Sequence, residues 1–428
     1  MDLAPTKPVD ATNSSRRNAT FISVFIIIFS AALAYSNSFN GPFVFDDVPT
    51  IVNSPSIRQL WPIWPVLFMA GVSAIGRPLV NLSFALNYAY GGLNVTSYHI
   101  VNIFIHVVAG LAFFGVVRRT LERSAASIQL NEHATQIALF CSLIWTLHPL
   151  QTESVTYVVQ RSESLGGLFY LLTLYCAIRA DSSRRSTVWA TVSFLACLCG
   201  VASKETIVSA PLAVIVYDWA FSGCTIHSLL QRRRWLYASL FSTWIPLMFL
   251  VFLGRWGSAG FGYGLSSWEY SMTQFGAIVG YLRLCIWPDS LVLDYGAGVT
   301  RNANEIAPAA IIVGLLACGS IVAIKYQRWI AFLGFVFFAA LSPSSSFIPL
   351  VTQTIAEHRM YLSLASVVVL AVVVIWQTCR SIVRKWYPKI SSSRFEWLVP
   401  GFVLSLIAIC FGTMTFSRNF EYGDAIRT

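Results

Sequence analysis

Long apolar runs recur along the whole chain, and no other feature of the sequence limits the fold so strongly. Hydrophobic residues make up 56% of the 428 residues, whereas charged residues make up only 11%. Several of the runs approach the roughly 20 residues that an α-helix needs to cross a bilayer. A soluble chain of this length does not have such a composition. We therefore predict an all-α polytopic membrane protein.

The runs predict about 11 transmembrane helices, of which the first, at 19–35, follows a polar tail that contains Arg16 and Arg17. Because no clear cleavage site follows this run, we interpret it as a retained signal anchor. A short run at 275–287, interrupted by Arg283, is interpreted as re-entrant or interfacial. The other predicted spans are 98–117, 135–147, 165–178, 187–202, 207–221, 235–253, 306–324, 329–341, 361–376 and 397–416.

The basic residues form short clusters between the apolar runs, such as Arg118-Arg119 and Arg184-Arg185. The net charge of +10 alone suggests nucleic acid, but this distribution follows the positive-inside pattern of membrane proteins. We predict no nucleic-acid partner, a cytoplasmic N-terminal tail and an extracytoplasmic C-terminal tail. The predicted parts are the tail 1–18, the membrane domain 19–417 with a first outer loop at 36–97 and interfacial helices at 57–69 and 79–90, and the tail 418–428.

Two adjacent carboxylates, Asp46 and Asp47, follow the first apolar run. Charges close to a membrane span are costly to keep and are usually functional. The alternative is a solvated turn between Pro42 and Pro49, which suits aspartate well. The residues by themselves leave both interpretations open.

Neither the acids nor the cysteines predict a metal site. Asp46 and Asp47 lack a histidine or third acid at fixed spacing. The nine cysteines lie mostly in or beside apolar runs without paired zinc-type spacing, and we interpret them as small buried hydrophobic residues. We predict no metal and no obligatory cofactor, with a divalent metal as the less favoured alternative.

Further charged residues collect at the predicted outer ends of the spans. An arginine on the outer side, such as Arg161, has a planar fork that matches phosphate. Simpler interpretations are an ion pair of Lys204 and Glu205 that caps a helical hairpin, a local hydrogen bond for His148, and an interfacial anchor at 357–361. The outer residues are Arg77, His148, Glu153, Arg161, Glu163, Lys204, Glu205, Arg255, Asp294, Glu357, His358 and Arg359.

A carboxylate pair that faces several basic residues suggests one kind of chemistry. An acceptor hydroxyl loses its proton to a carboxylate as it attacks, while a lipid-linked phosphate leaves toward positive charge. The carboxylate and the phosphate-binding groups must then lie on opposite sides of the reacting sugar carbon.

The motifs resemble the membrane domain of the transmembrane and tetratricopeptide-repeat (TMTC-like) O-mannosyltransferases and their bacterial relatives, within the GT-C glycosyltransferase superfamily. They cover nearly the whole chain in the family's order. They are FVFDD at 43–47, GRPL at 76–79, YHIVN at 98–102, HPLQTE at 148–153, VQRSESL at 159–165, ASKE at 202–205, LDYG at 293–296 and EHRMYL at 357–362.

This resemblance implies a GT-C fold, an active site on the extracytoplasmic face, a polyprenyl-phosphate sugar donor and inversion at the anomeric carbon. The catalytic carboxylate falls on Asp46 or Asp47, and we predict Asp46 as the base, with Asp47 orienting the acceptor or holding the loop. The candidates for donor-phosphate binding are Arg77, Arg161, Lys204 and Arg359, with His358 as a weaker one. The other site candidates are His148, Glu163, Glu205, Asp294 and Glu357.

The sequence departs from the family at its end, because the chain stops at 418–428, about where the family's repeats would begin. The expected sugar is mannose, and the expected acceptor is a hydroxyl of a protein Ser/Thr or of a cell-envelope component. The resemblance alone favours a bacterial inner membrane. The rival interpretations are a transporter or flippase of a lipid-linked anion, disfavoured by the lack of charges near span centres, and a non-catalytic scaffold.

Overall fold

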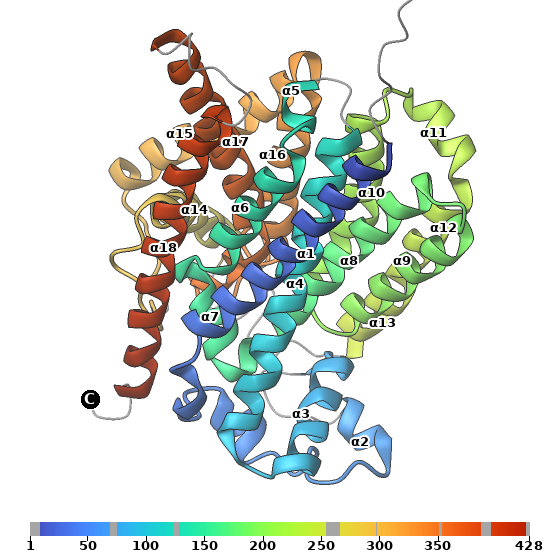
Figure 1. Ribbon diagram of the computed structural model, residues 1–428. Helices are drawn as coiled ribbons and strands as arrows, with labels where there is room; N and C mark the ends of the chain where they lie inside the picture. The colour runs from blue at the N-terminus through green and yellow to red at the C-terminus, as the bar shows by residue number, and fades with distance from the viewer. Residues whose placement is uncertain are drawn as a thin grey trace, which may run out of the picture.

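The computed structural model describes residues 9–68, 75–123, 128–253, 266–296, 298–350, 353–386 and 395–424, and this part of the chain is helical (Figure 1). The predicted all-α class is confirmed. Arg255, which the sequence analysis places on the outer face, lies outside the described residues. The helices are α1 (Val9–Ala34), α2 (Ile63–Phe68), α3 (Pro78–Gly91), α4 (Val95–Arg123), α5 (Ile128–Asn131), α6 (Ala134–Thr146), α7 (Thr152–Thr156), α8 (Arg161–Ser182), α9 (Ser186–Val201), α10 (Ala210–Phe221), α11 (Ile226–Arg232), α12 (Arg234–Ser242), α13 (Trp244–Leu253), α14 (Ser267–Ile286), α15 (Ala303–Tyr326), α16 (Arg328–Leu341), α17 (Met360–Trp386) and α18 (Phe395–Asp424).

Every predicted span falls on these helices, with three differences. Helix α1 begins at Val9, inside the predicted polar tail, and the run at 235–253 is divided between α12 and α13. The run at 207–221 begins in the 3₁₀ helix Glu205–Ser209 before it continues as α10. Among the described residues, six stretches are long and apolar enough to cross a membrane, or seven if one bent pair counts as a span. The chain is therefore an integral membrane protein, and the number of 11 spans stays a prediction.

The run at 275–287 is the second half of the 20-residue helix α14, which continues without a break. Its start at Ser267 is fixed by a capping box between Ser266 and Glu269, two polar residues that the apolar run does not include. The helix is therefore longer than the apolar run. Helix α14 is not among the six described stretches that are long and apolar enough to span a membrane.

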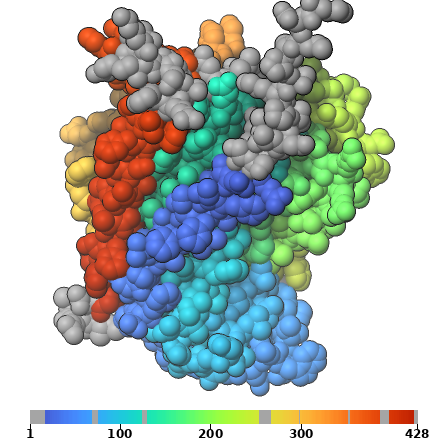
Figure 2. Space-filling view, viewed as in Figure 1, coloured from blue at the N-terminus to red at the C-terminus, as the bar shows by residue number. Residues whose placement is uncertain are grey.

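Helices α4, α6, α8 and α17 form the centre of the bundle. In the apolar stretch of α4, 61% of the residues are buried, whereas the corresponding shares are 17% in α15 and 22% in α1. Figure 2 shows α1 lying across the outside of the bundle next to α18. Glycine allows the central helices to approach closely, since a Cβ at Gly110 of α4 would lie 2.6 Å from the Thr146 hydroxyl of α6.

The first outer loop and helices α2 and α3 lie at one end of the bundle, the end that also holds α7 (Figure 1). Helix α3 begins with Pro78, whose missing N–H is not needed there, and ends before Gly92, which has φ 58°. The predicted interfacial helix at 79–90 is therefore confirmed as a helix. Of the one predicted at 57–69, only 63–68 is helical in the described part.

Candidate active site

Asp46 and Asp47 share one turn but differ in exposure. Asp46 is exposed, whereas the Asp47 side chain is fully buried. The Asp47 carboxylate accepts the Val44 N–H through Oδ2 at 3.1 Å and the Val159 N–H through Oδ1 at 2.7 Å. Asp47 therefore ties the loop both to itself and to the segment that leads into α8.

Phe45, directly before the two acids, has a left-handed backbone with φ 42°. A bulky residue rarely adopts this conformation, which costs about 1–3 kcal/mol. Tyr157 holds the turn, because its hydroxyl oxygen accepts the Asp46 N–H at 2.9 Å and its ring meets that of Phe45 edge-on. The surrounding contacts thus keep a strained turn in place with Asp46 at its exposed tip.

Burial controls the proton affinity of the groups beneath this turn. It raises the pKa of Asp47 to about 7, although the N–H groups of Val44 and Val159 act in the opposite direction. Burial and the nearby Asp46 and Asp47 carboxylates raise the pKa of Tyr157 as well, so its phenol stays protonated. Asp47 is a buried group that holds the loop, while Asp46 is the exposed carboxylate.

A second group of charges joins loops that are far apart in the sequence. The Arg77 guanidinium lies 3.2 Å from the Glu205 carboxylate, and Lys204 Nζ lies 3.0 Å from Glu163 and 4.0 Å from Glu205. Lys204 and Glu163 are almost entirely buried, whereas the Arg77 side chain is 21% exposed. Two cations and two carboxylates therefore balance one another at the edge of the protein interior.

His358 extends this group toward α7. Its Nε2 lies 3.8 Å from Glu163 Oε1, its Nδ1 forms a 2.7 Å hydrogen bond with Glu153 Oε1, and its backbone N–H donates to Glu153 Oε2. Burial raises the pKa of Glu153 to about 8, against the opposing effects of the His358 N–H and the Arg359 charge. We call the whole set the charged chain: Arg77, Glu205, Lys204, Glu163, His358 and Glu153.

Backbone contacts assemble the charged chain. The Leu79 N–H donates to the Ala202 carbonyl at 2.9 Å, which joins the segment after Arg77 to the segment before Lys204. A Cβ at Gly166 of α8 would lie 2.7 Å from the Lys204 Cβ, so only glycine allows α8 to approach this closely. The three segments are thereby fixed relative to one another.

The segment from Tyr157 to Glu163 connects the strained turn with the charged chain. Tyr157 and Val159 bind the turn, while the Ser162 hydroxyl accepts a hydrogen bond from Arg77 at 3.3 Å and Glu163 pairs with Lys204. Five residues separate Tyr157 from Glu163, and the six residue steps between them correspond to roughly 10 Å along a helix axis. One short rigid segment therefore sets the position of the carboxylate relative to the cations.

Arg161 lies inside the protein in the middle of this segment. It is fully buried and donates to the Asn102 and Asn87 side-chain oxygens, the Ser83 hydroxyl and the Tyr98 carbonyl. Its guanidinium also lies 4.6 Å from the Phe84 ring centroid. Neutral acceptors thus occupy its fork, and this arrangement favours a positioning role over the predicted contact with phosphate.

The remaining predicted residues lie in local networks. Arg359 donates to the Thr354 and Gln353 carbonyls and to the Tyr270 hydroxyl. Glu357 is buried and accepts the Val292 N–H and the Tyr295 hydroxyl. Asp294 is exposed and accepts the Gly296 N–H, while His148 is buried, bonded to the Cys285 carbonyl and the Leu150 N–H, with its pKa lowered to about 4 by burial.

Within the described ranges, no three His, Cys, Asp or Glu side chains are grouped so that they could hold a metal ion. Both Asp47 oxygens already accept backbone N–H groups. The expectation of a metal-independent site stays a prediction.

Sequence comparisons show which known proteins this chain is similar to. Human TMTC3, a protein O-mannosyl-transferase, is 27% identical over 254 residues, and human TMTC2 is 30% identical over 245. Drosophila melanogaster Tmtc1 is 26% identical over 328 residues, which is 69% of this chain and 37% of that protein. The chain resembles the TMTC O-mannosyltransferases. The resemblance drawn from the motifs is thereby confirmed.

The aligned part covers 55% of this chain and 26% of human TMTC3, and 53% of this chain and 27% of human TMTC2, so the chain matches about a quarter of the length of these relatives. No family model matches the chain. Among solved structures, the crystal structure of ArnT from Cupriavidus metallidurans bound to undecaprenyl phosphate aligns with 92% of this chain and 70% of that chain. Its TM-score is 0.47 and its sequence identity 12%.

The sequence analysis did not select the neutral residues that fix this candidate site. Tyr157 holds the strained turn, and Asn102 and Asn87 hold Arg161. Asn102 could have been found from sequence, because an amide inside an otherwise apolar predicted span must find a polar partner. Tyr157 gives no such signal, since its hydroxyl contacts a backbone group 111 residues away.

Proposed function

We propose that this protein is a GT-C glycosyltransferase that moves a sugar, mannose by analogy with its relatives, from a polyprenyl-phosphate donor to a hydroxyl acceptor. The observation that carries the proposal is the segment Tyr157–Glu163. It contacts the turn with the exposed Asp46 at one end and the paired cations at the other. This arrangement supplies a base and a phosphate-binding region at a fixed separation.

In the proposed reaction the acceptor oxygen attacks the anomeric carbon while its proton passes to the Asp46 carboxylate. The bond between the anomeric carbon and the phosphate oxygen breaks, and the phosphate leaves with the bonding electrons. Attack opposite the leaving group inverts the anomeric centre. Asp47 does not touch the reactants in this scheme, because its carboxylate is buried and bonded to the loop.

Arg77 and Lys204 are the cations that we assign to the leaving phosphate. Arg77 remains partly exposed, and both cations are paired with carboxylates, which an incoming phosphate can replace in part. Arg161 and Arg359 would instead hold the protein around the site, since their guanidinium groups are bonded to neutral protein acceptors. His358 would orient Glu163 and Glu153 within the charged chain.

The proposed site faces the extracytoplasmic side, and the proposed membrane is the bacterial inner membrane. The distribution of basic residues supports the orientation. Arg123, Arg232 and Arg233 pair with Asp181 and Asp218 around the ends of α4, α8 and α10, far along those helices from the Asp46 turn. We propose that no metal is required and that the acceptor is a protein or a cell-envelope component.

The test is sugar transfer in membranes that contain the wild type, Asp46→Asn or Asp47→Asn. Radiolabelled polyprenyl-phosphate mannose is the donor, and label is followed into the protein, lipid and water-soluble fractions. Asp46→Asn should lower transfer by about 10²- to 10⁴-fold, the range for loss of a general base. Asp289→Asn is the matched control, because Asp289 is an exposed aspartate paired only with surface groups.

Transfer at the wild-type rate in Asp46→Asn would overturn the assignment of the base. Movement of labelled donor across the bilayer without transfer would support the transporter instead.

A further inference from the structure

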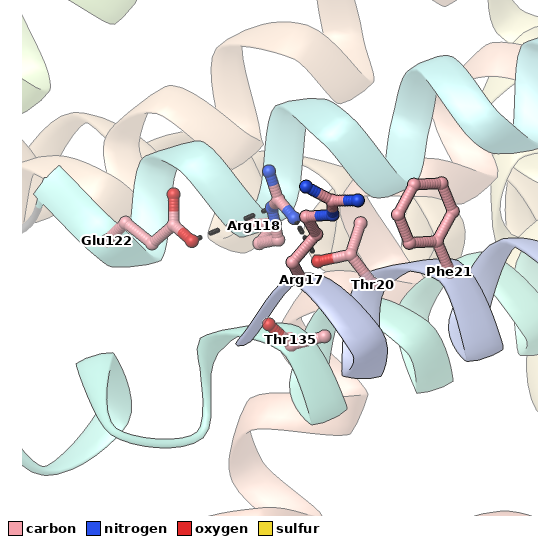
Figure 3. Close-up of a pocket in the computed structure, with 6 residues that line it drawn as sticks. All are labelled: Arg17, Thr20, Phe21, Arg118, Glu122 and Thr135. Atoms are coloured by element: carbon pink, nitrogen blue, oxygen red, sulfur yellow. Dashed lines mark hydrogen bonds and ion pairs between the residues drawn. The ribbon is translucent and has the colours of Figure 1, made fainter. Parts of the chain in front are cut away.

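A cavity of about 330 Å³ lies between α1, α4 and α6, and the proposed reaction does not use it. Its lining contains Arg17, Thr20 and Phe21 of α1, Arg118 and Glu122 of α4, and Thr135 of α6 (Figure 3). Arg118 is 16 residues from Asn102, the residue of α4 that binds Arg161. That separation corresponds to about 24 Å along the helix. The cavity is therefore distinct from the candidate active site.

The charges in this cavity suit an anion. Two guanidinium groups face one carboxylate within the lining, and in Figure 3 the two guanidinium groups lie together between α1 and α4. Arg118 donates to the Thr20 hydroxyl and lies 3.6 Å from Glu122, while Arg17 lies over the Phe21 ring. A single negative charge would balance the excess, and guanidinium groups beside hydroxyls match the oxygens of a phosphate.

The apolar surface that continues from the cavity indicates a lipid rather than a soluble anion. Phe21 is 64% exposed, and Phe25 and Phe29 follow at intervals of four residues with exposures of 68% and 58%. Residues at this spacing lie on one face of a helix, so the three rings form an apolar stripe that leads away from the arginines along α1. The acyl chains of a lipid can pack against such a stripe, whereas inorganic phosphate has no apolar part that could do so.

We propose that this cavity binds the phosphodiester headgroup of a glycerophospholipid whose acyl chains lie along the stripe Phe21, Phe25 and Phe29. Basic pockets between transmembrane helices near the membrane surface are known to take such headgroups. The site is independent of the proposed transferase reaction. A bound lipid would join α1 to α4 and α6 at the end of the bundle away from Asp46.

The test is native mass spectrometry of the detergent-purified full chain with added dioleoylphosphatidylglycerol. The wild type should retain one lipid, and the double variant Arg17→Gln, Arg118→Gln should bind about tenfold more weakly, as expected when charged hydrogen bonds to phosphate are lost. Arg119→Gln is the matched control. It removes one arginine charge next to Arg118 in the sequence, where Arg119 lies over Tyr175 outside the cavity, and so controls for the loss of charge at this end of α4.

Two further measurements separate the sources of phosphate and guard against misfolding. Phe25→Ala changes only an exposed side chain, so it should fold normally; it should weaken lipid binding and leave the effect of inorganic phosphate on thermal stability unchanged. Equal lipid occupancy in the wild type and the double variant would overturn the proposal, as would an equal loss in Arg119→Gln. Arginine-dependent stabilisation by inorganic phosphate, with lipid binding unaffected by Phe25→Ala, would show a soluble anion instead and overturn the lipid assignment.

Discussion

The Asp47 carboxylate and the Val159 backbone N–H, 112 residues apart in sequence, form a buried 2.7 Å hydrogen bond. This bond joins the first outer loop to the segment Tyr157–Glu163, whose Ser162 and Glu163, at the start of α8, bind Arg77 and Lys204. The two adjacent acids therefore have different roles: Asp47 holds the loop, and Asp46 is exposed at its tip. The contacts of this site lead to four predictions.

Asp47→Asn should destabilise the protein by about 1–3 kcal/mol, the cost of leaving a buried backbone donor without a partner. An amide offers only one acceptor oxygen, so it cannot serve both Val44 and Val159. Thermal unfolding in detergent measures the effect. Asp46→Asn is the internal comparison, and it should stay within about 0.5 kcal/mol of the wild type because its side chain is exposed. Equal stability of the two variants would contradict the loop-holding role.

Tyr157→Phe should lower kcat about tenfold and leave KM for the donor unchanged, because it removes one hydrogen bond that orients Asp46 and touches no substrate. Steady-state transfer assays separate the two constants. Tyr90→Phe makes the same change at a residue that is 91% exposed and should have no effect. A raised KM with unchanged kcat would instead make Tyr157 a binding residue.

Arg161 and Arg77 should respond to lysine in different ways. Arg161→Lys should cost about 3 kcal/mol or more, because one ammonium cannot satisfy the four acceptors that the fork of this fully buried arginine now binds. Arg77→Lys should leave stability nearly unchanged and raise KM for the donor, since its side chain is partly exposed. Unfolding and donor titration are measured on both variants. If the Arg161→Lys protein were stable but bound the donor more weakly, Arg161 would be a phosphate-binding residue instead.

Stability should fall as pH rises from about 4.5 toward about 8. Burial raises the pKa of Glu153 from 4.5 to about 8 and that of Asp47 from 3.8 to about 7. Between these values the folded chain keeps protons that the unfolded chain has released, so the stabilisation is complete below the unfolded pKa and is lost as pH rises through the folded pKa.

Glu153→Gln should make the melting temperature depend less on pH over the same interval. Glu305→Gln, at an exposed glutamate, should retain the wild-type slope. A melting temperature that rises with pH in the wild type would contradict the direction assigned to Glu153.

Much of the helical architecture could be predicted from the sequence because each span is specified locally. A run of apolar residues must be helical in a bilayer, since no water is present to satisfy the backbone. The predicted runs fall on helices such as α4, α15 and α17 for this reason. The charged residues could also be selected, since a charge beside an apolar run is costly unless it is used.

The roles of those charged residues depend on tertiary structure. Arg161 and Arg77 are equal candidates in the sequence. In the folded chain Arg161 is bonded to two amides and a hydroxyl, whereas Arg77 is partly exposed and paired with a carboxylate. Asp46 and Asp47 are adjacent and chemically identical. The left-handed backbone of Phe45 nevertheless leaves Asp46 exposed, whereas Asp47 is buried and accepts the Val159 N–H. An all-helical membrane protein with acids and bases at one end could thus be predicted from residue order alone, because hydrophobicity acts locally along the chain. Which carboxylate is exposed and which cations are already bonded depends on the folded chain, because the partners lie far apart in the sequence: 112 residues for Asp47 and Val159, and 59 for Arg161 and Asn102.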